Sequence, residues 1–144
     1  MALQYALMNN PPPHASPELA SFHSDLDWYL GHVRSLAMGP EDCCIDQGNY
    51  LVAGELFYFS LQSTQLADDP LGLMTAQQKL AVERLRHSIS QVPPQARRGA
   101  PTADASLADM RHPAWELPRR LAQELLLALA PLAPAHDATD PFHG

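Results

Sequence analysis

The sequence predicts an all-α protein, an irregular bundle of about four helices with a proline-rich N-terminal arm. Apolar residues recur at helical spacing over three long segments. Helix-start signatures precede two of those segments. Only residues 45–65 also resemble a strand, and a strand without a partner is unstable. The alternative is therefore an α+β domain with a small hairpin around residues 45–65.

Length and composition indicate a single domain. A chain of 144 residues with 46% hydrophobic and 17% charged residues is long enough to bury a core. We expect an extended arm over residues 1–15, which contains Pro11-Pro12-Pro13. One helical domain follows over 16–135, with a mobile linker at 93–105 that is rich in Ala, Pro, Gly and Arg. Residues 136–144 are predicted to form a tail.

The first helix is predicted to begin after Ser16 and to end at Gly39-Pro40. Ser16 offers a hydroxyl cap, Pro17 takes the first helical position, and Glu18 is an acid in the first turn. The apolar residues expected on its buried face are Leu19, Phe22, Leu26, Tyr29, Leu30, Val33 and Ala37.

Residues 41–67 permit two interpretations. A strand over 51–62 would explain the aromatic enrichment of that segment. A helix would be apolar all round and hence a buried central helix. We favour the helix because no partner strand is evident. Its two apolar sides would be Ile45, Val52, Leu56, Phe59 and Leu66 on one, and Tyr50, Phe57 and Leu61 on the other.

Two further helices are predicted in the second half of the chain. Thr75 and Gln78 form a capping-box pattern, and the helix they begin should run to about Val92. The last helix should run from near Pro118 to about Ala130. Its predicted buried stripe is Leu117, Leu121, Leu125, Ala128 and Leu132. Leu126 and Leu127 lie off that stripe, so either the helix is central to the fold or these leucines form a self-association surface; we favour burial.

Charge is distributed unevenly along the chain. The first 70 residues hold nine acids and one base, and the net charge of the whole chain is −7, so the negative charge is concentrated in the first half. Such a field attracts a basic partner protein and repels nucleic acid. The residues predicted to contact the partner are Asp25, Asp27, Trp28, His32, Glu41, Asp42, Asp46, Asp68 and Asp69.

Trp28 is the expected anchor of that surface. It falls far from the centre of the apolar stripe, on a helix face that otherwise carries small residues. A large aromatic side chain beside carboxylates is typical of an interaction hot spot. The competing interpretation is that another helix of the same chain covers Trp28.

No residue pattern predicts catalysis, a cofactor or a metal. Cys43 and Cys44 lie among Glu41, Asp42 and Asp46, and carboxylates disfavour a reactive thiolate. His23 with Asp27, and Asp25 with His32, share helix faces, but two ligands do not make a zinc site. No Walker, G-x-G-x-x-G, H-E-x-x-H or G-x-S-x-G pattern occurs. We therefore favour a non-enzymatic protein without cofactors.

These observations favour an acidic domain that binds another protein and that is located in the cytoplasm of a bacterium. An immunity-type protein that neutralises a toxin needs no catalytic residue, because occlusion is a binding event, and opposite charge speeds the encounter. The alternatives are a dimeric chaperone or adaptor for a secreted protein and a small helical enzyme or ligand-binding bundle. No membrane span is expected, and a monomer and a homodimer remain open.

Overall fold

The computed structural model describes residues 16–61, 64–99 and 101–132, and these are helical or in turns, without a strand. The all-α prediction is confirmed, and the hairpin alternative at 45–65 is wrong for the described residues. No helix in these ranges is long and apolar enough to cross a membrane. The helices are α2 (Pro17–Ala37), α3 (Pro40–Asp46), α4 (Val52–Leu61), α5 (Thr64–Asp68), α6 (Ala76–Ser90), α7 (Ala103–Met110) and α8 (Glu116–Leu129), with 3-10 turns η2 (Pro94–Ala96), η3 (Pro113–Trp115) and η4 (Ala130–Leu132). The predicted arm and the end of the chain lie outside the described residues.

Helix α2 begins as its sequence predicts. The Ser16 hydroxyl accepts the backbone N–H of Leu19 at 3.1 Å, and Pro17 stands at the first helical position. The predicted apolar stripe is largely confirmed, because five of its seven members are buried; Leu19 and Ala37 are only partly buried. The five are Phe22, Leu26, Tyr29, Leu30 and Val33.

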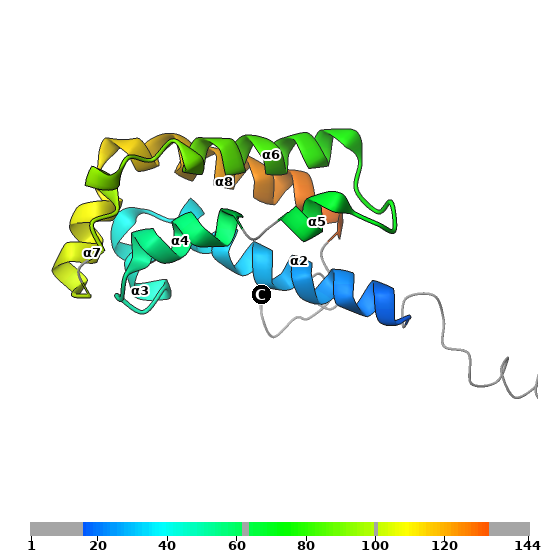
Figure 1. Ribbon diagram of the computed structural model, residues 1–144, viewed down its shortest axis with the longest axis horizontal. Helices are drawn as coiled ribbons and strands as arrows, with labels where there is room; N and C mark the ends of the chain where they lie inside the picture. The colour runs from blue at the N-terminus through cyan, green and yellow to red at the C-terminus, as the bar shows by residue number, and fades with distance from the viewer. Residues whose placement is uncertain (1–15, 62–63, 100, 133–144) are drawn as a thin grey trace, which may run out of the picture.

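Helix α8 packs against both α2 and α6, and Figure 1 shows α6 and α8 side by side along one edge of the molecule. Its second half is held to the end of α2, where Gln123 donates to the Ala37 carbonyl at 3.0 Å. Arg119 donates to the carbonyls of Met38 and Met110, both at 3.0 Å, so one cation caps two helices at once.

The buried stripe of α8 differs from the prediction. The buried residues are Pro118, Ala122, Leu125 and Leu129, whereas Leu117 is 47% exposed. Leu127 is 79% exposed, so the expectation that it is buried was wrong. The leucines surround so much of this helix that periodicity alone does not identify which arc meets α2 and α6.

The described part of residues 41–67 forms three helices, α3, α4 and α5, instead of one. The chain leaves α3 through Gly48 and Asn49, both in the left-handed region with φ of 82° and 58°. The Gly48 N–H donates to the Ile45 carbonyl and the Asn49 N–H to the Cys44 carbonyl, which together form a Schellman cap. The break lets α4 run in a different direction from α3, and Ile45, Tyr50 and Leu61 are exposed instead of buried.

The segment predicted to be a mobile linker makes specific contacts with the core. The Asp109 carboxylate, at the end of α7, accepts the backbone N–H groups of Arg98 and Gly99 at 3.1 and 3.2 Å. The buried Trp115 indole donates to the Ala96 carbonyl at 2.9 Å. Helix α7 itself begins at Ala103, inside the predicted linker.

Helix α6 is confirmed with its capping box. Thr75 and Gln78 exchange side-chain and backbone hydrogen bonds of 2.7 and 3.1 Å. The same Gln78 side chain donates to the Ala128 carbonyl at 3.0 Å. This bond places the first turn of α6 beside the last turn of α8, so the two helices are antiparallel.

Candidate functional site

An open groove of about 580 Å³ lies between the first half of α2 and the end of α5 with the turn that follows it. We call it the acidic groove, because three carboxylates, those of Glu18, Asp25 and Asp68, line it, and all three residues are exposed. The other lining residues are Pro17, Ser21, Phe22, Leu66, Pro70 and Leu71. The groove thus combines an apolar floor with an acidic rim.

Helical spacing explains how α2 supplies its half of the acidic groove. Glu18, Phe22 and Asp25 lie at positions i, i+4 and i+7, which share one face of a helix. The second half depends on the turn after α5. There the Asp69 carboxylate accepts the N–H groups of Leu73 and Met74, both at 2.8 Å. Asp69 therefore holds the turn that presents Asp68 to the groove.

Asp69 itself is not available to a partner protein. Its side chain is fully buried, and Lys79 lies 3.7 Å from its carboxylate. Asp68 and Asp69 are neighbouring acids in one predicted turn, yet the structure separates their side chains. Asp68 lines the groove, whereas Asp69 satisfies backbone donors beneath it.

Trp28 lies on α2 about one helical turn beyond Asp25, and it does not line the acidic groove. Its ring centroid lies 4.5 Å from that of His32 and 6.3 Å from that of Phe59, a residue of α4. We call these three residues the Trp28 cluster. Trp28 is nevertheless 45% exposed. Helix α4 therefore covers one edge of the indole and leaves the rest exposed, so the interpretation that another helix of the same chain covers Trp28 holds for that edge only.

His32 is fixed in this cluster by two contacts. Its ring stacks on Phe59 at 5.0 Å with an interplanar angle of 22°. Its Nδ1 lies 3.0 Å from the Trp28 carbonyl, and because a carbonyl only accepts, Nδ1 carries the proton. The Trp28 backbone and the His32 ring thus form one rigid unit on the surface of α2.

Two of the three acids of α3, Glu41 and Asp46, make contacts within the protein. Arg111 donates to Glu41 at 2.6 Å, which lowers the pKa of the Glu41 carboxyl. The Asp46 carboxylate accepts the hydroxyl of the buried Ser35, and Gln47 donates to the same hydroxyl at 2.7 Å. The structure therefore does not join these acids to the acidic groove. Asp42 and Asp27 are exposed, and neither lines the groove.

The two cysteines are buried at the contact of α3 with the core. Burial raises the pKa of the Cys43 thiol to about 12. Burial, with a further contribution from Glu41, also raises the pKa of Cys44. Both groups are thiols at neutral pH and so are poor nucleophiles. In the described ranges no three His, Cys, Asp or Glu residues gather where a metal ion could bind.

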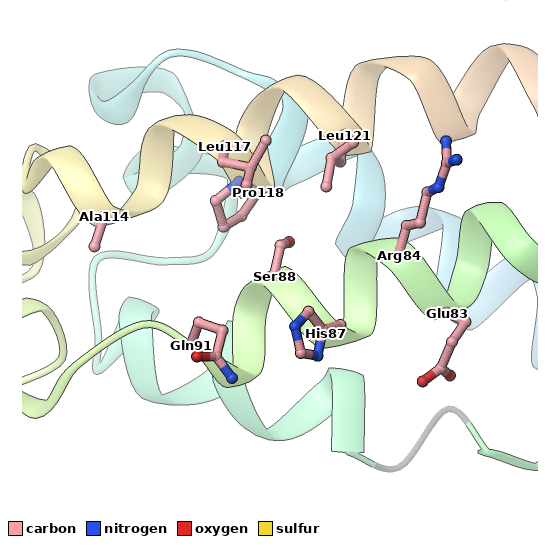
Figure 2. Close-up of a pocket in the computed structure, with 9 residues that line it drawn as sticks. All are labelled: Glu83, Arg84, His87, Ser88, Gln91, Ala114, Leu117, Pro118 and Leu121. Atoms are coloured by element: carbon pink, nitrogen blue, oxygen red, sulfur yellow. The ribbon is translucent and has the colours of Figure 1, made fainter.

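A second groove, of about 710 Å³, lies between α6 and α8 (Figure 2). Leu117, Pro118 and Leu121 of α8 face Ser88 across it, as Figure 2 shows. We call it the α6–α8 groove. Its remaining lining residues are Glu83, Arg84, His87, Gln91 and Ala114. It shares no lining residue with the acidic groove.

The sequence analysis identified Asp25 and Asp68 but not their partners in the acidic groove. Glu18 was assigned only to the first turn of its helix, and Phe22 and Leu66 only to the core. The i, i+7 spacing of Glu18 and Asp25 was a usable signal for a shared face. Comparisons with protein-family models, curated proteins and solved structures find no match.

Proposed function

We propose that this protein binds a basic partner protein through the acidic groove and Trp28, and that it is a non-enzymatic immunity-type neutraliser of the bacterial cytoplasm. The observation that carries the proposal is one groove in which Glu18, Asp25 and Asp68 surround an apolar floor. In the part of the chain that the structure describes, no ion pair engages these three carboxylates.

The groove favours a segment that carries both apolar and cationic side chains. Three carboxylates near one another repel, and a Lys or Arg placed among them removes that repulsion. An apolar side chain of the same segment would contact Phe22 and Leu71, of which Leu71 is 42% exposed. Opposite charge also speeds the encounter of two proteins. Occlusion of a toxic surface requires nothing more than such binding.

Trp28 supplies the anchor next to the groove. Tryptophan dominates hot spots because it brings a large, rigid contact area. The indole already contacts the His32 and Phe59 rings, and these contacts reduce the side-chain entropy that binding would cost. We expect Trp28→Ala to weaken binding by about 2 kcal/mol, which is roughly a 30-fold rise in Kd.

The test is coexpression with the toxic product of the adjacent gene, followed by titration of the purified pair at low and high salt. We expect wild type to protect growth, Asp25→Asn/Asp68→Asn to slow association, and added salt to weaken binding. Glu116→Gln/Glu124→Gln is the matched control, because it removes two exposed acids from α8. The proposal fails if no such partner binds, or if Trp28→Ala and the groove variant bind like wild type.

A chaperone or adaptor for a secreted protein is the second candidate. It is favoured by the exposed leucines of α8, since such a protein would be a homodimer. Leu117 is 47% and Leu127 79% exposed. A partner that is bound unfolded and exported, instead of being inhibited, would favour this candidate over the neutraliser.

A further inference from the structure

The acidic groove begins next to the first residue that the structure describes. Pro17, which lines the groove, directly follows Ser16, where the described chain begins. From Pro17 the groove extends along α2 to Asp25, which is about 12 Å of helix axis. Residues 1–15, the N-terminal arm, are therefore attached to the chain at one end of the groove.

The apolar lining of the acidic groove is partly exposed. Pro17, Pro70 and Leu71 line the groove and are exposed, and the exposed fraction of Leu71 is 42%. Pro70 and Leu71 lie in the turn that the buried Asp69 carboxylate holds through its bonds to the backbone. Because the turn is fixed in this way, its apolar side chains stay at the surface unless another segment covers them. Covering them removes apolar surface from water, which is favourable.

The sequence distinguishes the two terminal segments as occupants of the groove. Residues 133–144 contain two Asp residues, which the carboxylates that line the groove would repel. Residues 1–15 contain neither Asp nor Glu. They bring apolar surface in the proline run 11–13 and, next to it, the side-chain amides of Asn9 and Asn10, which can donate hydrogen bonds to carboxylates. The arm therefore matches both the apolar and the acidic part of the groove.

We propose that the N-terminal arm folds back along α2 and occupies the acidic groove through residues 9–13. Five residues in polyproline-type conformation, at about 3.1 Å per residue, span about 12 Å, which equals the length of the groove along α2. Residues 14 and 15 form the reversal, so the prolines lie at the Pro17 end of the groove and the asparagines at the Asp25 end. Consecutive prolines favour this conformation before docking, so they lose little backbone entropy.

Attachment to α2 makes a weak contact sufficient. A short connection gives the arm an effective concentration on the order of 1 mM at the groove, so a contact with a dissociation constant of about 1 mM is occupied about half of the time. The arm is then a built-in competitor, and half occupancy raises the apparent dissociation constant of a partner about twofold. This consequence rests on the proposed function, whereas docking of the arm does not. An arm that docks although no partner binds would refute only the proposed function, and a partner that binds while the arm stays free would refute only this inference.

A nitroxide label on the full chain tests the proposal. Met8→Cys places the label beside the docking residues without replacing one of them, and the two native cysteines are buried. We expect the label to broaden away the amide NMR signals of Ser21 and Leu71, which line the acidic groove, and to leave the signal of Leu117 in the α6–α8 groove. Reduction of the nitroxide should restore the lost signals.

A pair of matched variants of the labelled chain separates docking from chance proximity. Leu71→Asp replaces an apolar lining residue with a further carboxylate and should restore the Ser21 signal. Leu80→Asp is the control, because Leu80 is 52% exposed on α6 and does not line the acidic groove, and it should leave the Ser21 signal lost. Circular dichroism checks that both variants keep their helices.

A variant in the arm gives a second test that leaves every described residue unchanged. Pro11→Gly/Pro12→Gly/Pro13→Gly raises the entropy that docking costs and should restore the Ser21 signal too. The proposal is overturned if Ser21 keeps its signal in the labelled chain, or if the signal stays lost in both Leu71→Asp and the glycine variant. It is equally overturned if labelled chains broaden the Ser21 signal of unlabelled, isotope-enriched chains mixed with them, because the arm then docks on a second copy.

Discussion

Asp68 and Asp69 are neighbours in the sequence with different roles in the structure, so substituting each of them tests the assignment directly. The buried Asp69 carboxylate accepts the N–H groups of Leu73 and Met74, both at 2.8 Å. A hydrogen bond to a charged group contributes roughly 1.5–3 kcal/mol. Asp69→Ala removes two. Because Leu73 is 37% exposed and water can replace its partner, we take the lower end of that range, about 3 kcal/mol in total. The half-exposed Lys79 adds less than about 1 kcal/mol.

For a chain of this size about 1 kcal/mol shifts Tm by roughly 2–4 °C, so Asp69→Ala should lower Tm by about 6–12 °C. Asp68→Ala, which removes an exposed groove residue, should stay within about 0.5 kcal/mol of wild type. Asp69→Asn controls for backbone strain, because φ at this position is 44° and Asn tolerates that region better than Ala. It should still cost at least about 1 kcal/mol. Urea unfolding followed by circular dichroism measures all three. A loss under about 1 kcal/mol for Asp69→Ala, or an equal loss for Asp68→Ala, refutes the reasoning.

Three further predictions follow from buried groups. Leu129→Ala should destabilise the fold by about 2–5 kcal/mol and Leu127→Ala by less than about 0.5 kcal/mol, measured by thermal unfolding, since Leu129 is fully buried and Leu127 is exposed. Trp115→Phe should cost about 1–3 kcal/mol because it leaves the Ala96 carbonyl without its donor; an unchanged urea midpoint would contradict this. The Cys43 thiol should react with iodoacetamide at pH 8 at least about tenfold more slowly in the native state than in denaturant, because only the thiolate attacks. Since burial raises its pKa from about 9 to about 12, its contribution to stability is present below pH 9 and is lost as pH rises towards 12.

The positions that sequence reasoning located well are those where a local rule decides the structure. Ser16 and Thr75 cap helices because their side chains satisfy donors that lie three residues away. The break after α3 obeys an equally local rule, and Gly48-Asn49 was a readable signal for a Schellman cap. It was missed because the apolar pattern on both sides suggested one continuous helix. The buried arc of α8 had no such local signal, since it depends on where α2 and α6 lie.

The candidate site shows a second limit of prediction from sequence. The number of acids in a segment does not determine which of their side chains face solvent and which bond to other parts of the chain. The first 70 residues carry nine acids, yet Asp69 turns inward to backbone N–H groups and Glu41 pairs with Arg111, seventy residues away in the sequence. Asp109 was not a site candidate, and it proves to hold the backbone of Arg98 and Gly99. A carboxylate near unsatisfied N–H groups is more stable bonded to them than solvated. The long-range field of the chain is therefore a poor guide to its contact surface. A better guide is the set of acids that line an apolar groove and make no ion pair within the described residues, and we propose Glu18, Asp25 and Asp68 on that ground.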